Sequence, residues 1–181
     1  MCQALITPVG DFVGTLGGGL VESEAVEAMR AAGESGRPLV FERRLDDDYS
    51  REAGPICGGV MRIFINPRVS ESRDAIAKGL NALAHRRRSL LVTRLGEPNG
   101  GGRIECVQSG NGVAMPALAP GQPDADDLFA AERPALLRTE TGDEIFVEPL
   151  SPPPRLLIVS GGHVGQAIAH LTPALGFEST V

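Results

Sequence analysis

The stretch Gly14-Thr15-Leu16-Gly17-Gly18-Gly19 stands between a predicted strand and a predicted helix, and it organises the first part of the chain. Glycine loses more conformational freedom on folding than any other residue, so a run of it is favoured where the backbone needs a positive φ or a ligand approaches closely. A second glycine turn, Ile56-Cys57-Gly58-Gly59, carries a thiol. Two such turns in one small domain predict a site for an anionic, sulfur-bearing ligand.

Helical and strand patterns alternate around these turns. Apolar residues recur at helical spacing over residues 21–32 and 72–87, which predicts two amphipathic helices. Residues 117–127 are rich in Pro, Gly and Asp, and we expect a surface loop there. The alternation predicts an α/β or α+β fold with a mixed sheet in residues 1–150. Strands are expected at residues 4–8, 12–13, 38–44, 60–65, 89–95 and 104–108, with a hairpin formed by 135–140 and 144–150.

The run Ser151-Pro152-Pro153-Pro154 predicts a stiff linker and a domain boundary near residue 151. After it, residues 155–181 read as a strand, a glycine turn, a helix and the start of another strand. In a dinucleotide-binding turn the glycines permit the bend, the approach of the pyrophosphate and close helix packing. Here Ser160 takes the first glycine position, and the chain ends at Val181 before the ribose-binding acidic residue would be expected. We therefore expect an incomplete Rossmann-like unit at residues 151–181, with poor order or homodimer docking.

Composition excludes several classes of protein. The net charge of -6 and pI of 5.1 argue against a nucleic-acid partner. No apolar run reaches the roughly 20 residues that span a bilayer, and no signal segment is recognised, so we expect a cytoplasmic protein. The three cysteines are far apart, which predicts neither a disulfide framework nor a structural zinc site. Of these, Cys106 lies in an alternating strand and is expected in the core.

Three motifs in this order resemble the XdhC/CoxI family, whose members are accessory proteins of xanthine dehydrogenase and related molybdenum hydroxylases. The motifs are residues 14–22, residues 56–59, and residues 153–165 with Gly162-His163-Val164-Gly165 at their end. The resemblance implies an XdhC/CoxI domain at residues 1–150 followed by a Rossmann-like domain. It also implies a maturation chaperone that assists sulfuration and insertion of the molybdenum cofactor, as molybdopterin or a nucleotide derivative. The implied partners are an apo molybdenum hydroxylase and a cysteine desulfurase.

Each motif suggests a role toward that cofactor. The backbone of Gly17, Gly18 and Gly19 would cradle its phosphate at the start of a helix, with the Thr15 hydroxyl as a further donor. The Cys57 thiolate would contact the molybdenum or its terminal sulfur, since thiolates suit soft metals and sulfur exchange. The predicted cofactor-binding residues are Thr15, Gly17, Gly18, Gly19, Cys57, Gly58, Gly59, Gly162 and Gly165, with Cys57 as the metal ligand.

Other interpretations of the same residues remain open. The glycine run can be a plain strand-to-helix connection, and Cys57 can be a small buried hydrophobe. His163 lacks a second ligand at metal-site spacing, and arginines 86–88 are expected to form a solvated helix end. No catalytic residue is assigned, because neither a Ser-His-Asp order nor a carboxylate pair with a positioned base is present, and this favours a chaperone over an enzyme. The alternatives are an NAD(P)-binding oxidoreductase, disfavoured by the incomplete phosphate turn, and a pure interaction scaffold.

Overall fold

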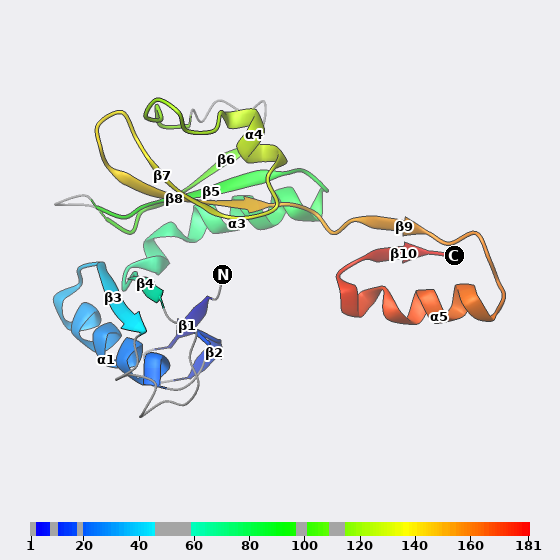
Figure 1. Cartoon of the computed structure of the whole chain (residues 1–181), viewed down its shortest axis with the longest axis horizontal. Helices are drawn as coiled ribbons and strands as arrows, with labels where there is room; N and C mark the ends of the chain where they lie inside the picture. Colours follow the sequence, from blue (N-terminus) through cyan, green and yellow to red (C-terminus); the bar gives the residue numbers. More distant parts are fainter. Residues whose placement is uncertain (1–2, 8–10, 18–19, 46–58, 97–100, 109–114) are drawn as a thin grey trace.

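Helices and strands are mixed along the chain and form three groups in the computed structural model (Figure 1). The structure describes residues 3–7, 11–17, 20–45, 59–96, 101–108 and 115–181. We name the three groups the N-terminal unit (residues 3–65), the central unit (69–150) and the C-terminal unit (155–180). The predicted α/β or α+β class is therefore confirmed.

The N-terminal unit combines one helix with two antiparallel strand pairs. Strands β1 (Ala4–Ile6) and β2 (Phe12–Gly14) pair with each other, and β3 (Leu39–Leu45) pairs with β4 (Gly59–Ile65). Helix α1 (Leu20–Ser35) packs against β3 and β4. Its buried residues repeat at helical spacing, as the sequence pattern predicts. They are Val21, Ala25 and Ala32.

The central unit contains a four-stranded antiparallel sheet in the order β6-β5-β8-β7. A short 3-10 helix, η1 (Val69–Ser72), leads into α3 (Arg73–Ala84), which packs on one face of the sheet. The opposite face holds the main apolar core, which joins residues from four strands to Leu128 of α4 (Ala125–Ala130). The strands are β5 (Ser89–Arg94), β6 (Ile104–Gln108), β7 (Ala135–Arg138) and β8 (Glu144–Leu150).

Helix α4 corrects one prediction. Residues 117–127 were expected to form a surface loop, but the helix begins at Ala125. The Asp124 carboxylate caps it by accepting a hydrogen bond from the backbone N–H of Asp127 at 2.8 Å. Burial of Leu128 against the sheet, at 2% exposure, then stabilises a helix too short to form alone. The turn composition of the segment concealed this contact.

The C-terminal unit is a small β-α-β arrangement that stands apart from the other two units (Figure 1). Strand β9 (Arg155–Leu157) leads to α5 (His163–Leu171), the 3-10 turn η2 (Pro173–Leu175) and β10 (Glu178–Thr180). Strand β10 pairs in parallel with β9, whereas the described pairings within residues 1–150 are antiparallel. The strand, turn and helix predicted after the prolines are confirmed.

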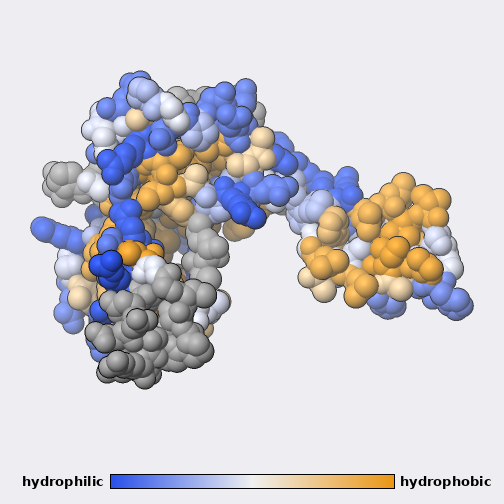
Figure 2. Space-filling model, in the orientation of Figure 1, coloured by the Kyte–Doolittle hydropathy of each residue, from blue (hydrophilic) through white to orange (hydrophobic). Residues whose placement is uncertain are grey.

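Large apolar side chains cover much of this unit's surface. Figure 2 shows them as a hydrophobic region spread over the C-terminal unit. A small β-α-β unit has little interior in which to bury such side chains, so they remain in contact with solvent. Those more than 60% exposed are Leu157, Val159, Val164, Leu171, Leu175 and Val181.

Candidate functional site

The turn before α1 is closed by its own side chains. The Thr15 hydroxyl and the Leu16 N–H both donate to Glu22 Oε1, each at 2.8 Å. The Gly17 N–H donates to Thr15 Oγ1 at 3.0 Å, and the Thr15 N–H donates to the Gln3 carbonyl in front of β1 at 3.2 Å. Glu22 therefore reaches back from the first turn of its helix, in the manner of a capping-box glutamate.

This arrangement does not fit a phosphate at the described part of the turn. The hydroxyl of Thr15 and the N–H groups of Leu16 and Gly17 already have acceptors. A phosphate bound there would also lie close to the Glu22 carboxylate, and two neighbouring negative charges repel each other. Gly18 and Gly19, the other predicted phosphate ligands, lie outside the described residues.

Gly59, the described residue of the second glycine turn, lies near the start of α1. It pairs with Leu45 at the end of the β3–β4 pair that residues 46–58 connect in sequence, and Arg43 near that end donates from Nε to Glu24 Oε2 at 2.7 Å. Glu24 belongs to the beginning of α1, so this ion pair fixes the hairpin end beside the helix start. Figure 1 shows the tip of β3 pointing toward the end at which α1 begins.

Gly17 and Gly59 both have backbone conformations that favour glycine. Their φ angles are +107° and +147°, and, among the described residues beyond their chain neighbours, no atom lies within 4 Å of the position that a Cβ would take. A side chain at either residue would therefore be strained by the backbone conformation and not by a clash with these described atoms. Cys57 and Gly58 precede Gly59 directly in the sequence and lie outside the described residues.

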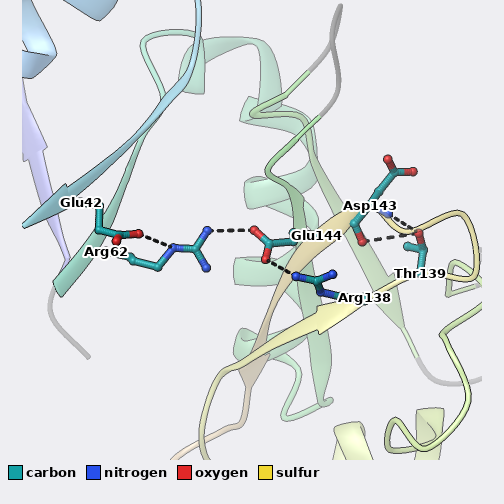
Figure 3. Close-up of polar contacts among 6 residues, drawn as sticks. All are labelled: Glu42, Arg62, Arg138, Thr139, Asp143 and Glu144. Carbon is teal, nitrogen blue, oxygen red and sulfur yellow. Dashed lines mark hydrogen bonds and ion pairs between the residues drawn. The ribbon is translucent and has the colours of Figure 1, made fainter. Parts of the chain in front are cut away.

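A chain of charged side chains joins the N-terminal unit to the central sheet (Figure 3). Arg62 of β4 donates to Glu144 of β8 at 2.9 Å and lies 3.7 Å from Glu42, while Arg138 lies 3.5 Å from the other oxygen of Glu144. The hydrogen bond from Arg62 is the main cause that lowers the pKa of Glu144, and the same bond raises the pKa of Arg62. Glu144 is therefore held in its charged form.

The pKa of a second carboxylate on β8, Glu148, is shifted in the opposite direction. Glu148 accepts a hydrogen bond from the Gln3 side-chain amide, but burial outweighs this bond and raises the pKa of Glu148. Glu144 and Glu148 are four residues apart on one strand, so they face the same side of the sheet. Sequence reasoning missed both, although the alternation of β8 places them on a face separate from the buried Ile145 and Val147.

The glycine turn of the C-terminal unit shows a packing role. Gly162 is the N-cap of α5 and has no side-chain cap. A Cβ at Gly165 would lie 2.3 Å from the Ser160 carbonyl oxygen, so only glycine lets the helix approach the end of β9 this closely. Close helix-strand packing is one of the glycine roles in a dinucleotide-binding turn. His163, the first residue of α5, is exposed.

The structure also describes Cys106 and arginines 86–88, for which the sequence made predictions. Cys106 is buried, as expected for a core residue. Among the residues that the structure describes, no group of three His, Cys, Asp or Glu side chains could hold a metal ion, and no helix has the length and apolar character needed to cross a membrane. The solvated helix end predicted for arginines 86–88 is wrong for Arg86, which is partly buried and whose guanidinium contacts Pro153 and Glu178. Arg87 and Arg88 are exposed as predicted, and Arg88 also donates to the Phe129 carbonyl at 2.8 Å.

Comparisons with known proteins found a partial sequence match and a structural match. No family model matches the chain. A 64-residue stretch, 35% of this chain, is 36% identical to the uncharacterized protein YqeB of Escherichia coli (strain K12), of which it covers 12%. A solved structure described as a xanthine dehydrogenase from Bacillus halodurans matches with a TM-score of 0.65 and 19% identity, over 97% of this chain and 51% of that one. The chain thus shares its fold with that protein and spans about half of its length.

Proposed function

We propose that this protein is an accessory protein of molybdenum hydroxylases, which holds the molybdenum cofactor and assists its sulfuration and insertion. The observation that carries the proposal is the location of Gly59, in the second glycine turn, near the start of α1, which follows the first glycine turn. The fold likeness to a protein described as a xanthine dehydrogenase, over 97% of this chain, supports the choice of partner class. In this proposal residues 1–150 handle the cofactor and residues 151–181 belong to a Rossmann-like domain.

Cys57 is the central residue of the proposed site. It precedes Gly59, the described residue of the second glycine turn, by two residues in the sequence. When bound there, the cofactor would supply a soft metal and a terminal sulfur, for which a thiolate is a suitable ligand. The Thr15 hydroxyl already donates to Glu22. We therefore assign the phosphate contacts to the backbone of Gly18, Gly19 and Gly58. An apo hydroxylase and a cysteine desulfurase would be the partners.

The test is cofactor content. The full chain, expressed in a host that makes molybdenum cofactor, is expected to retain molybdenum, measured by mass spectrometry, and pterin, measured by fluorescence after oxidation. Loss of a ligating thiol should lower both by about tenfold or more in Cys57→Ala. Cys106→Ala is the matched control, because its thiol lies in the core. Wild-type contents no higher than those of an unrelated protein would contradict the proposal.

One observation favours a second function, an interaction scaffold in which the first glycine turn is structural. The donors of Thr15, Leu16 and Gly17 are all satisfied within the chain, as a plain connection requires. The scaffold predicts that Cys57→Ala leaves maturation of a hydroxylase intact while Glu22→Ala, which opens the turn, lowers it through loss of the fold. The cofactor-binding function predicts loss of maturation in Cys57→Ala with an unchanged unfolding temperature.

A further inference from the structure

The C-terminal unit is connected to the central unit by four residues, 151–154, that lie outside any helix or strand. Three of them are prolines, which hold the backbone extended but do not fix the direction in which the following unit points. Figure 1 shows the unit at the far end of this extended segment. Its orientation therefore depends on side-chain contacts.

Arg86 occupies an unfavourable backbone position at the end of α3. Its φ is +56°, the positive φ angle found among the described residues other than glycine. The N–H of Arg87 donates to the Ala82 carbonyl at 2.8 Å, and that of Arg86 to the Leu83 carbonyl at 2.9 Å. These two bonds define a Schellman motif, in which the residue at the position of Arg86 is usually glycine. Arg86 thus carries a long side chain at a position where the backbone conformation alone favours glycine.

The Arg86 side chain makes contacts that a glycine could not. One guanidinium nitrogen donates to Glu178 Oε2 of β10 at 2.5 Å, and another donates to the Pro153 carbonyl in the linker at 2.8 Å. Glu178 also lies 3.4 Å from Arg155 of β9, and its own N–H donates to the Pro154 carbonyl at 2.9 Å. Arg86 thus bonds to the linker and, through Glu178, to both strands of the unit. Its side chain is only 29% exposed.

We propose that Arg86 is a clasp that fixes the C-terminal unit in one orientation relative to the central sheet, and that the unit pivots about residues 151–154 when the clasp opens. The strained backbone supports this role, because a left-handed conformation at a non-glycine residue is retained where the surrounding contacts require it. Within the described residues, the Arg86 guanidinium donates the hydrogen bonds that cross from the central unit to the linker and β10. The proposal does not depend on the function proposed above.

The Arg86→Gly variant separates the clasp from the helix end. Glycine accepts the positive φ without strain, so the end of α3 and the central sheet should keep their structure. The measurement is the rotational correlation time of each unit, from ¹⁵N relaxation of the full chain. In the wild type, the amides of residues 155–180 should tumble with those of β5. In Arg86→Gly they should tumble faster than β5, whose own value stays that of a folded domain.

Two further variants complete the test. Glu178→Gln removes the ion pair but leaves Arg86 and its backbone conformation in place. It should also make residues 155–180 tumble faster than β5. Arg87→Gly, a neighbouring change at an exposed side chain, should leave the unit tumbling with β5. The proposal is overturned if residues 155–180 already tumble independently in the wild type, or if Arg86→Gly leaves their correlation time equal to that of β5.

Discussion

Glu144 and Glu148 show how two identical side chains on one strand acquire opposite properties. Glu144 lies between Arg62 and Arg138, and the arginine contacts lower its pKa. Glu148 lies deeper, with the Gln3 amide as its hydrogen-bond partner, and desolvation raises its pKa. The N-terminal unit thus contacts two carboxylates of β8. The surroundings of Glu144 stabilise its charged form, and those of Glu148 destabilise it.

Glu148→Gln should stabilise the protein at neutral pH. Because the pKa of Glu148 is raised in the fold, the folded state binds more protons than the unfolded state above the ordinary glutamate pKa, and stability falls as pH rises through that window. The amide removes this cost, and its oxygen can still accept from Gln3. We expect the thermal unfolding midpoint to rise by about 2 °C at pH 7 and the difference to vanish below about pH 4. A lower midpoint at pH 7 would contradict this interpretation.

Glu144→Gln should have the opposite effect. Its pKa is lowered in the fold, so the charged form stabilises the protein above the ordinary glutamate pKa, and this contribution is lost as pH falls through the lowered value. We expect urea unfolding at pH 7 to show a loss of about 0.5–1 kcal/mol, the range of partly exposed ion pairs. Glu42→Gln removes the longer, 3.7 Å contact to the same arginine and is the control. An equal loss in both variants would argue against a specific role for Glu144.

At the scale of elements, those with a strong period were predictable from the sequence. The strands and helices at residues 21–32, 38–44, 60–65 and 89–95 correspond to α1, β3, β4 and β5 within a few residues. These segments bury a face that repeats with the period of the element, which is the property that the sequence pattern reports. Helix α4 lacked such a pattern, because its stability comes from one cap and one buried leucine.

The candidate site was less predictable. The sequence indicated the turn before α1 and its glycine at positive φ, since these follow from local backbone preferences. It did not reveal that Glu22 would accept hydrogen bonds from Thr15 and Leu16, because this depends on the path of the chain between β2 and α1. The available signal was a glutamate in the first turn of a helix, the capping-box position. The role of Cys57 stays a prediction.

Two helical glycines provide a test of how each helix is packed. Gly33 in α1 has open space where a Cβ would stand, whereas a Cβ at Gly79 in α3 would lie 2.7 Å from Leu150 Cδ1 and 3.4 Å from Leu91 Cδ2. Gly33→Ala should raise the free energy of unfolding by about 0.5–1 kcal/mol through helix propensity. Gly79→Ala should give no gain, because Leu150 must move. Equal gains in thermal or urea unfolding would show that α3 is not packed closely on the sheet.

At the scale of the whole molecule, the units should differ in local stability. Strand β5 has neighbours on both sides and contains the buried Leu90 and Val92, whereas β9 and β10 are three residues long and largely exposed. Amide hydrogen exchange should therefore be slowest in β5. We expect exchange in β9 and β10 to be about 100-fold faster or more, since opening a small unit does not require opening the sheet. Equal protection in these strands would indicate one cooperative structure.

The strand order β6-β5-β8-β7 has a consequence for how the chain is made. Strand β5 finds β6 soon after both leave the ribosome, and β7 finds β8 in the same way, because each pair is close in sequence. Joining the two hairpins requires β5 to pair with β8, which is synthesised more than fifty residues later. Contacts so distant in sequence form slowly. During synthesis the β5–β6 hairpin would therefore expose the apolar face that carries Leu90, Val92 and Val107 until β8 is made. In that interval a ribosome-associated chaperone could bind this face.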